Sequence, residues 1–209
     1  MSEKLKAHYR ELLRKFGDSA ESAQYSSRES QERRFEILAQ VADLNGSSIL
    51  DFGCGAGHFC SYLRARGLKF DYTGVDIVEE FFDIAREKNP QARFGTPESF
   101  AHEKFDYVFV SGVFNNKRRD NRKFYQESVR KLFAMCTQGL AFNLMSTYVD
   151  YQDAGLFYES PERAFRFVKQ ELTPLVCLRH DYEVKPGIVP FEFAIFAYRN
   201  PSLQEMKTK

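Results

Sequence analysis

The sequence predicts an α/β domain with a mostly parallel sheet, helices on both faces and a helical extension at its N-terminus. Three observations support this fold class. Short apolar runs alternate with amphipathic stretches from about residue 30 onward, as strands alternate with helices in βαβ units. A glycine-rich turn directly follows the first apolar run, and the last two apolar runs have no helical stretch between them. The 209 residues, of which 43% are hydrophobic and 28% charged, suit one domain with a full core.

Two helices are expected before the first strand. Apolar residues at helical spacing predict a helix over residues 2–16, which Gly17 ends. Residues 18–30 are polar and rich in serine, so they are expected to form a loop or hinge. A second helix is expected over about residues 30–43.

Strands and helices alternate over the rest of the sequence. Strands are expected over residues 49–52, 72–75, 92–94, 105–110, 139–145, 175–182 and 191–198. Helices are expected between them over about residues 57–66, 78–88, 120–136 and 161–171. Ser160 is the expected N-cap of the last helix, with Pro161 at its first position. Because no helix separates the last two strands, they should pair antiparallel, and the final strand, apolar on both faces, should lie inside the sheet.

Charge and cysteine usage argue against several classes of partner. The formal net charge of +1 gives no overall field that would attract nucleic acid. No two of the four cysteines have the spacing of a metal site, so no metal is expected, and free thiols fit a reducing compartment. No apolar run approaches the roughly 18 residues of a membrane span, and no signal peptide is visible. A cytoplasmic protein without a membrane partner is therefore expected.

The strongest functional signal is the turn that follows residues 49–52. Asp51 near the end of this strand is followed by Gly53, Gly55 and Gly57, with Cys54 between the first two. Glycine permits a tight turn and lets a ligand approach the backbone without a Cβ in the way. The turn is also expected at the carboxyl end of the strand, where ligands bind in open α/β sheets. The alternative is a glycine turn with a purely structural role.

The glycine spacing bears on which ligand is bound. A dinucleotide-binding turn has the pattern G-x-G-x-x-G, whereas counting from Gly53 the sixth position here is His58. The acid on the preceding strand also suits a cationic ligand better than a phosphate. A nicotinamide-dependent oxidoreductase stays an alternative, but a weaker one.

A second acid stands where a ribose-binding carboxylate is expected. Asp76 ends the second strand, and a carboxylate there can accept hydrogen bonds from both ribose hydroxyls. Its alternative role is the N-cap of the helix that begins near Val78, and the two roles can coexist.

These residues, together with residues 105–108 at the fourth strand, resemble the class I S-adenosylmethionine-dependent methyltransferase family. The resemblance covers about residues 30–200. It implies a Rossmann-like seven-stranded sheet in the order 3-2-1-4-5-7-6, with strand 7 antiparallel, and S-adenosylmethionine as the cofactor. Residues 31–35 and 111–115 resemble a bacterial subgroup that methylates small molecules.

The resemblance also implies which residues bind the cofactor. They are Asp51, Gly53, Cys54, Gly55, Gly57, Asp76, Ile77, Glu98, Ser99 and Ser111. Asp51 would approach the ammonium group directly or through water, Asp76 would bind the ribose, and Ile77 would pack on the adenine. Glu98 and Ser99 are both candidates for the contact to the adenine amino group. Ser111 would lie beneath the methionine part of the cofactor.

The acceptor is expected to be a small molecule, methylated on oxygen or nitrogen. The sequence lacks the Asn/Asp-Pro-Pro-Tyr/Phe motif of many enzymes that methylate nucleic acids and proteins, and residues 111–115 stand in its place. Polar side chains expected near the carboxyl edge of the sheet are candidates to bind the acceptor: Asn115, Asn143, Ser146 and Tyr148. The tyrosine could equally be an ordinary loop residue that covers the core.

His180 at the end of the sixth strand is the best candidate for a catalytic base. A hydroxyl acceptor needs a base, whereas an amine needs only to arrive neutral. A surface histidine with a satisfied hydrogen bond is the simpler alternative.

The N-terminal extension, residues 1–29, is expected to act as a lid over the methyltransferase domain of residues 30–209. An amphipathic helix followed by a polar hinge has the composition of a mobile cover. Tyr25 could then reach the carboxylate or sulfonium of the cofactor. The alternative for this extension is a helix that packs on the back of the sheet or mediates a dimer. For the protein as a whole, a further alternative is a non-catalytic protein that only binds the cofactor.

Overall fold

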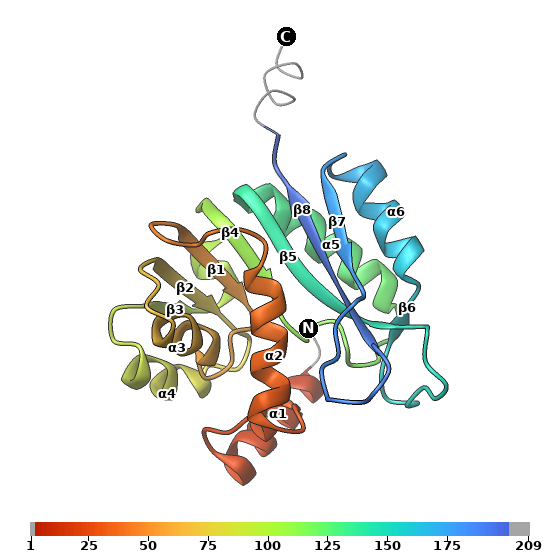
Figure 1. Cartoon of the computed structure of the whole chain (residues 1–209). Coiled ribbons are helices and arrows are strands. Elements are labelled where there is room, and N and C mark those ends of the chain that lie inside the picture. The colour runs from red at the N-terminus through yellow and green to blue at the C-terminus, as the bar shows by residue number, and fades with distance from the viewer. Residues whose placement is uncertain (1–2, 201–209) are drawn as a thin grey trace. The chain divides into compact units, whose positions relative to one another are not determined.

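The computed structural model describes residues 3–200, and the chain divides into two compact units between Glu103 and Lys104. Figure 1 shows the helices and strands of both units along the chain. Residues 1–2 and 201–209, which the predicted extension and domain include, lie outside the described residues.

The first unit contains three parallel strands in the order β3-β2-β1: Ser48–Phe52 (β1), Asp71–Val75 (β2) and Arg93–Gly95 (β3). Leu50 of β1 lies opposite Thr73 of β2 in the ladder. The helices that connect the strands are α3 (His58–Ala65) and α4 (Phe81–Lys88). Every strand and helix here falls where the sequence predicts it, although α4 begins three residues late because residues 78–80 form turns.

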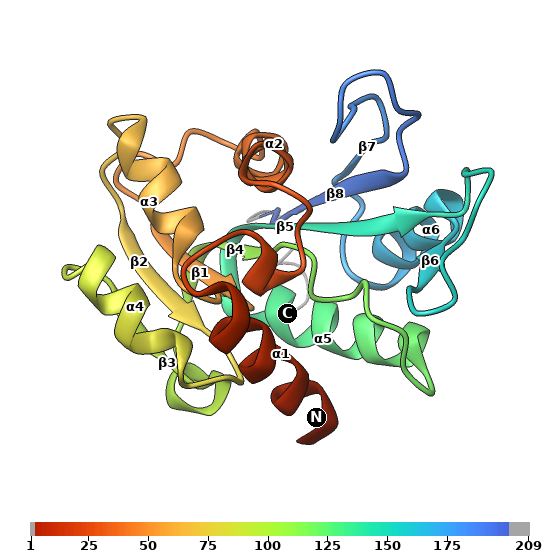
Figure 2. The ribbon, with the colours of Figure 1, turned by 90° about the horizontal axis from the view of Figure 1, so that it is seen from below.

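The N-terminal extension belongs to this same unit. It contains α1 (Glu3–Phe16), the short 3-10 helix η1 (Glu21–Ala23) and the start of α2 (Arg28–Ala39). Gly17, at φ +60°, ends α1 as expected. None of the residues of α1 is buried. In Figures 1 and 2, α1 lies off the ends at which β1 and β2 terminate.

The helix α2 is shifted toward the N-terminus relative to the prediction. It begins at Arg28 because the side chain of Ser27 accepts a hydrogen bond from the Ser30 amide and caps the first turn. It ends at Ala39, before Val41 and Leu44, which are nevertheless buried. The apolar periodicity continued into a buried turn, so it predicted burial correctly and the helix end incorrectly.

The second unit contains four main strands in the order β4-β5-β8-β7: Phe105–Val110 (β4), Cys136–Ser146 (β5), Val176–Arg179 (β7) and Glu192–Tyr198 (β8). β4 and β5 are parallel, whereas β8 runs antiparallel to both β5 and β7. The final strand therefore lies inside the sheet with its last neighbour antiparallel, as predicted. Two helices, α5 (Asn121–Met135) and α6 (Pro161–Glu171), complete this unit, and Ser160 caps α6 as expected.

Two features of the second unit were not expected. A short strand β6 (Tyr158–Glu159) pairs in parallel with Met145 and Ser146 at the end of β5. Two residues are too few to show any periodicity. β5 also begins at Cys136 directly after α5, because these residues pair with β4 although they are not apolar.

Together these elements confirm the predicted fold class, an α/β protein with mostly parallel strands and antiparallel C-terminal strands. Within residues 3–200, no helix is both long and apolar enough to span a membrane. The same residues contain no cluster of three or more His, Cys, Asp or Glu that could hold a metal ion.

Candidate active site

The glycine turn leaves the carboxyl end of β1 in a left-handed conformation. Gly53, Gly55 and Gly57 have φ angles of +86°, +50° and +72°. A side chain at any of these positions would be strained, because L-residues disfavour positive φ. At Gly57 a Cβ would also lie 3.1 Å from the side-chain Nδ2 of Asn89, whereas nothing lies within 4 Å of the Cβ position at Gly55. The middle of the turn thus presents bare backbone with open space above it.

Asp76 joins this turn to the segment that leads into α4. One oxygen of its carboxylate accepts a hydrogen bond from the amide of Gly55, at 2.9 Å, and the other accepts from the amide of Val78, at 2.9 Å. Burial raises the pKa of Asp76. The carboxylate therefore caps the turn before α4, whereas Glu80 is the N-cap residue of the helix itself, so the alternative role of Asp76 as the helix N-cap is wrong. Each oxygen can accept a second hydrogen bond, so the predicted ribose contact is compatible with this geometry.

Asp51 lies in the interior of the unit below the glycine turn. Its side chain is 4% exposed and accepts a hydrogen bond from the Tyr72 hydroxyl. Burial raises the pKa of Asp51 to about 7, and the nearby charge of Asp76 contributes. A cation bound beside this carboxyl group would favour its ionised form.

The predicted adenine contacts lie near the end of β3. Ile77 is half-buried, and Glu98 and Ser99 are exposed on the 3-10 helix η2 (Pro97–Phe100). The hydroxyl of Ser99 lies 3.3 Å from that of Thr96. Both polar candidates therefore stay accessible to a ligand.

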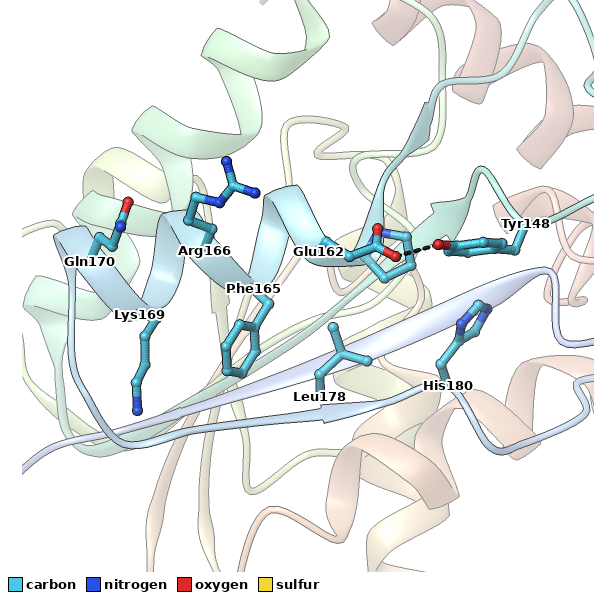
Figure 3. A pocket seen from close by; sticks show the side chains of 9 residues that line it. Tyr148, Glu162, Phe165, Arg166, Lys169, Gln170, Leu178 and His180 are labelled. Atoms are coloured by element: carbon cyan, nitrogen blue, oxygen red, sulfur yellow. Dashed lines mark hydrogen bonds between the residues drawn. The ribbon is translucent and has the colours of Figure 1, made fainter.

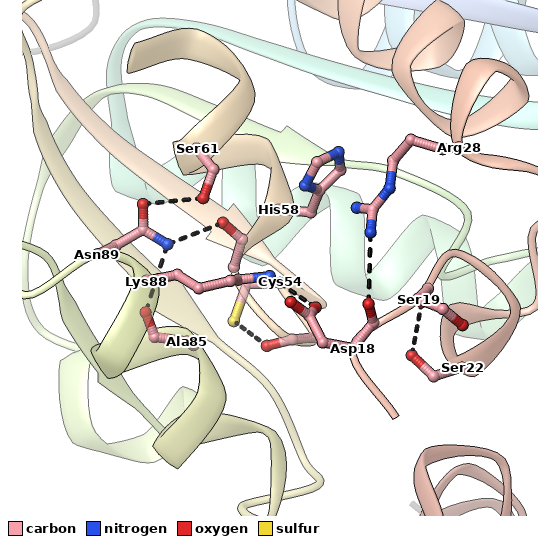
Figure 4. Close-up of polar contacts among 12 residues, drawn as sticks. Asp18, Ser19, Ser22, Arg28, Cys54, His58, Ser61, Ala85, Lys88 and Asn89 are labelled. Atoms are coloured by element: carbon pink, nitrogen blue, oxygen red, sulfur yellow. Dashed lines mark hydrogen bonds and ion pairs between the residues drawn. The ribbon is translucent and has the colours of Figure 1, made fainter. Parts of the chain in front are cut away.

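Ion pairs attach the N-terminal segment to α4. Arg10 pairs with Glu80 at 2.5 Å, and Asp18 pairs with Lys88 at 2.7 Å. In Figure 4, Lys88 reaches Asp18 in front of the turn that carries Cys54. Arg28 donates a hydrogen bond to the carbonyl oxygen of Asp18 at 3.5 Å. The segment that precedes α2 thus lies beside the glycine turn.

Tyr25 and α2 also lie on this side of the unit. Tyr25 is half-buried, and its ring lies 5.1 Å from the guanidinium carbon of Arg34. Glu32 of α2 lies 2.9 Å from His58, the residue after the last glycine of the turn. The first half of α2 is therefore adjacent to the start of α3.

In the second unit, Asn143 connects β5 to two other segments. Its amide oxygen accepts a hydrogen bond from the Gly112 amide at 2.8 Å, and its amide nitrogen donates to Glu192 at 2.8 Å. The side chain of Asn143 is buried, so these bonds fix the loop that follows β4. Ser111 and Asn115 belong to this loop. The side-chain oxygen of Asn115 is buried and makes no hydrogen bond within the described residues.

Glu192 is a candidate that the sequence analysis missed. It is 0% exposed, and its carboxylate also accepts a hydrogen bond from the Tyr182 hydroxyl at 3.4 Å. A carboxylate at the start of the apolar strand β8 is unusual, and this acid in an otherwise apolar run was the signal available in the sequence.

The remaining acceptor candidates lie at the end of β5. Ser146 is buried, and its hydroxyl accepts a hydrogen bond from the Tyr148 amide at 3.1 Å. Tyr148 is 60% exposed, and its hydroxyl donates to Glu162. Hydrogen bonds from Ser160 and Tyr148 lower the pKa of Glu162 to about 2.

His180 lines an open groove between α6 and β7, with a volume of about 610 Å³ (Figure 3). Its Nε2 lies 3.1 Å from the carbonyl oxygen of Pro190. Because a carbonyl only accepts, Nε2 is the donor and Nδ1 is the nitrogen that could take a proton. Tyr148 packs against the ring from the other side of the groove.

Comparisons with known proteins place the chain in a family. Residues 50–133 match the model of a methyltransferase domain. A Mycobacterium tuberculosis protein named as a methyltransferase, Rv1506c, is 33% identical over 144 residues, which cover 65% of this chain and 86% of that protein. The chain belongs to the class I S-adenosylmethionine-dependent methyltransferase family.

Solved methyltransferase structures share the fold. Magnesium protoporphyrin IX methyltransferase from Synechocystis, with bound S-adenosylhomocysteine, matches with a TM-score of 0.65 and 14% identity over 95% of both chains. The plantazolicin methyltransferase BpumL, in complex with a desmethylplantazolicin analogue and S-adenosylhomocysteine, matches with a TM-score of 0.61 and 13% identity over 94% of this chain and 97% of that chain.

As a member of this methyltransferase family, the protein uses S-adenosylmethionine, and the alternative of a nicotinamide cofactor is wrong. The first unit fits the cofactor. The open space at Gly55 admits a ligand to the backbone, and two carboxyl groups lie beside the turn. The buried, unpaired side-chain oxygen of Gln31 on α2 is a further polar group with no partner among the described residues.

Proposed function

We propose that this methyltransferase transfers the methyl group to an oxygen or nitrogen atom of a small, uncharged organic acceptor. The observation that carries the proposal is the buried, unpaired side-chain oxygen of Asn115 on the loop after β4. A buried acceptor atom without a partner is unfavourable by about 1–3 kcal/mol, so a ligand that donates to it gains affinity. Hydroxyl and amine nucleophiles both carry such a donor.

The hydrogen-bonded groups at the start of this loop favour an uncharged acceptor over an anionic one. Asn143, Tyr182 and Glu192 are neutral or acidic, so none supplies a positive charge that would attract a phosphate. The cations of the loop, Lys117, Arg118 and Arg119, follow later in it. The formal net charge of +1 agrees with this, because nucleic-acid partners usually need a basic surface. One of the related structures is named as a methyltransferase of a porphyrin, and the other is a plantazolicin methyltransferase in complex with a plantazolicin analogue. The acceptor therefore varies widely among proteins with this fold.

Different residues are proposed to bind the cofactor and to orient the acceptor. The cofactor supplies an activated methyl group on a sulfonium, and positioning of donor and acceptor provides much of the rate. We assign binding of the cofactor to Asp51, Gly53, Gly55, Gly57 and Asp76, with Cys54, Ile77, Glu98, Ser99 and Ser111 as further contacts. Asn143, Ser146 and Tyr148 orient the acceptor or its loop.

His180 serves as the base when the acceptor is a hydroxyl group. The bond from Nε2 to Pro190 holds the ring and leaves Nδ1 to accept the proton. The reducing cytoplasm is the compartment we propose, because all four cysteines are free thiols.

The test uses labelled S-adenosylmethionine with a panel of phenols, amines, carboxylic acids and short oligonucleotides. Transfer to a phenol or amine but not to carboxylic acids or oligonucleotides supports the proposal, whereas transfer only to a carboxylic acid or to nucleic acid contradicts it. With an acceptor found, Asn115→Leu should raise its KM by about tenfold, the effect of one lost hydrogen bond, without weakening S-adenosylhomocysteine. A KM unchanged in Asn115→Leu would remove Asn115 from the acceptor site.

A further inference from the structure

The first half of α2 carries two buried polar residues on one stripe of the helix. Gln31 is 6% exposed and Arg34 is 7% exposed, and residues three apart lie on the same helix face. Their neighbours Glu32 and Phe35 contact His58, at 2.9 Å and with a ring separation of 5.7 Å. This stripe therefore lies beside the residue that follows the glycine turn.

Arg34 carries a buried guanidinium that contacts Ser30 and Tyr25. Its Nη1 donates to the backbone oxygen of Ser30 at 2.8 Å and to the Ser30 hydroxyl at 2.7 Å. The guanidinium also stacks over the ring of Tyr25. These contacts fix the plane of the guanidinium, and a fixed guanidinium is suited to bind a carboxylate with two parallel hydrogen bonds.

Gln31 supplies the complementary group. Its side-chain oxygen is buried and makes no hydrogen bond within residues 3–200. An unpaired buried acceptor destabilises the protein unless a donor arrives. A cationic donor is the strongest partner that such an oxygen can find.

We propose that Arg34 and Gln31 bind the amino-acid end of the cofactor, with the carboxylate on Arg34 and the ammonium on Gln31. A fixed guanidinium and an unpaired acceptor one helical turn apart match the two charged groups of an α-amino acid. The assignment rests on the proposed cofactor site in this unit. It adds α2 to the glycine turn and Asp76, and gives Tyr25 the role of supporting the Arg34 guanidinium.

The experiment compares ligands that differ only at the amino-acid end. Calorimetry measures S-adenosylhomocysteine, its decarboxylated analogue and 5′-methylthioadenosine, which lacks the amino acid. The variants are Arg34→Met, Gln31→Leu and the control Arg33→Met, whose native side chain pairs with Glu36 at 2.7 Å on the same helix.

Arg34→Met should weaken S-adenosylhomocysteine by about 30-fold or more, as loss of a charge-assisted pair does, and leave the other two ligands within about twofold. Gln31→Leu should weaken S-adenosylhomocysteine and the decarboxylated analogue by about five- to tenfold, but not 5′-methylthioadenosine. It should also raise the Tm of the ligand-free protein, because it removes the unpaired oxygen. Arg33→Met should change none of these affinities.

Three results would overturn the assignment. In folded Arg34→Met, equal losses for S-adenosylhomocysteine and 5′-methylthioadenosine would make Arg34 a structural residue. Unchanged S-adenosylhomocysteine affinity in Gln31→Leu would show that Gln31 does not contact the cofactor. If Arg34→Met does not fold, the result for Gln31→Leu alone tests the assignment. A native protein that binds none of the three ligands would instead overturn the proposed cofactor site itself.

Discussion

Asp51 carries a proton at a pH where most aspartates are ionised. Its raised pKa of about 7 follows from its burial, and the Tyr72 hydroxyl only partly offsets this. Between about pH 4 and pH 7 the folded protein holds this proton and the unfolded chain does not, so this group makes stability fall as pH rises. A cation bound near Asp51 would favour the ionised carboxylate over the protonated form, so the proton would be released on binding.

Affinity for S-adenosylhomocysteine should therefore rise with pH. Below about pH 7 binding must displace the proton, which weakens affinity by up to about tenfold per pH unit. Above pH 7 affinity should level off. Calorimetry from pH 5.5 to 8.5 in two buffers of different ionisation enthalpy measures both the affinity and the proton release.

Asp51→Asn is the control for this pH dependence, and its profile should be flat over the same range. A native protein whose affinity is independent of pH would show that the cation does not meet Asp51.

Asn143 is a second buried residue whose hydrogen bonds determine its role. Asn143→Leu would leave the Gly112 amide and part of the Glu192 carboxylate without a partner. The free energy of unfolding should fall by about 2–4 kcal/mol, the range for breaking a buried polar network. Gln138→Leu on the same strand, at an exposed position, should change it by less than about 0.5 kcal/mol. Urea denaturation measures both, and similar values for the two variants would contradict a role for Asn143 in holding the loop.

At the scale of elements, glycine-to-alanine variants in and near the glycine turn should affect the free energy of unfolding and the affinity for the cofactor differently. Gly55 and Gly67 both have positive φ and open space at the Cβ position, whereas Gly57 packs closely against Asn89 and Phe94. Gly57→Ala should therefore lower the free energy of unfolding by about 2–3 kcal/mol. Gly55→Ala and Gly67→Ala should each lower it by about 1 kcal/mol, the strain of positive φ alone.

Binding should distinguish the last two variants. The Cβ at Gly55 would occupy the space where the ligand approaches the turn, so S-adenosylhomocysteine should weaken by at least about tenfold. Gly67 lies after α3, away from the turn, and Gly67→Ala should leave affinity unchanged. Thermal unfolding and calorimetry measure the pair. Equal affinities for Gly55→Ala and Gly67→Ala would exclude a close approach of the cofactor at Gly55.

The elements that sequence predicts well are those with a local signal. Apolar periodicity located the helices and strands around the glycine turn, and the Ser160–Pro161 pair located the start of α6. The structure differs where the cause is not local. β6 exists only because residues 158–159 pair with the end of β5, and α2 ends early because Val41 and Leu44 are buried in a turn.

The same reasoning explains the site. Asp51 and Asp76 were recognisable because they stand at fixed offsets from glycines and strand ends. Gln31 and Arg34 were not, because a polar residue on a helix is usually exposed. Only tertiary packing buries these two side chains, and local residue spacing does not reveal it.

At the scale of the whole molecule, most of the proposed cofactor residues lie in the first unit, whereas Ser111 and the proposed acceptor residues lie in the second. The glycine turn, Asp51, Asp76 and the N-terminal extension lie in the first unit, and Asn115, Asn143 and His180 lie in the second. The extension is therefore expected to affect cofactor binding first, and acceptor binding only when the cofactor is present.

The contacts of the extension favour a cover that opens and closes. No residue of α1 is buried, and the ion pairs of Arg10 with Glu80 and of Asp18 with Lys88 are partly exposed. Exposed ion pairs contribute only about 0–1 kcal/mol each, so α1 and Asp18 are held weakly without ligand, although Ala20 and Ser22 after them are buried. A cofactor that contacts Tyr25 or Arg34 would add contacts and hold the extension closed.

Limited proteolysis with a protease of broad specificity should show this closure in the full chain. Without ligand, residues 18–30 should be cleaved readily, because the weakly held segment opens often. Saturating S-adenosylhomocysteine should slow that cleavage by about tenfold or more, in proportion to the free energy that binding adds to the closed state. The loop of residues 185–190 in the second unit, with Ile188 and Val189 exposed, is the internal control and should be cleaved at the same rate in both conditions. Equal slowing at both loops would indicate general stabilisation of the fold, and unchanged cleavage of residues 18–30 would mean that the extension is a fixed part of the first unit and covers nothing.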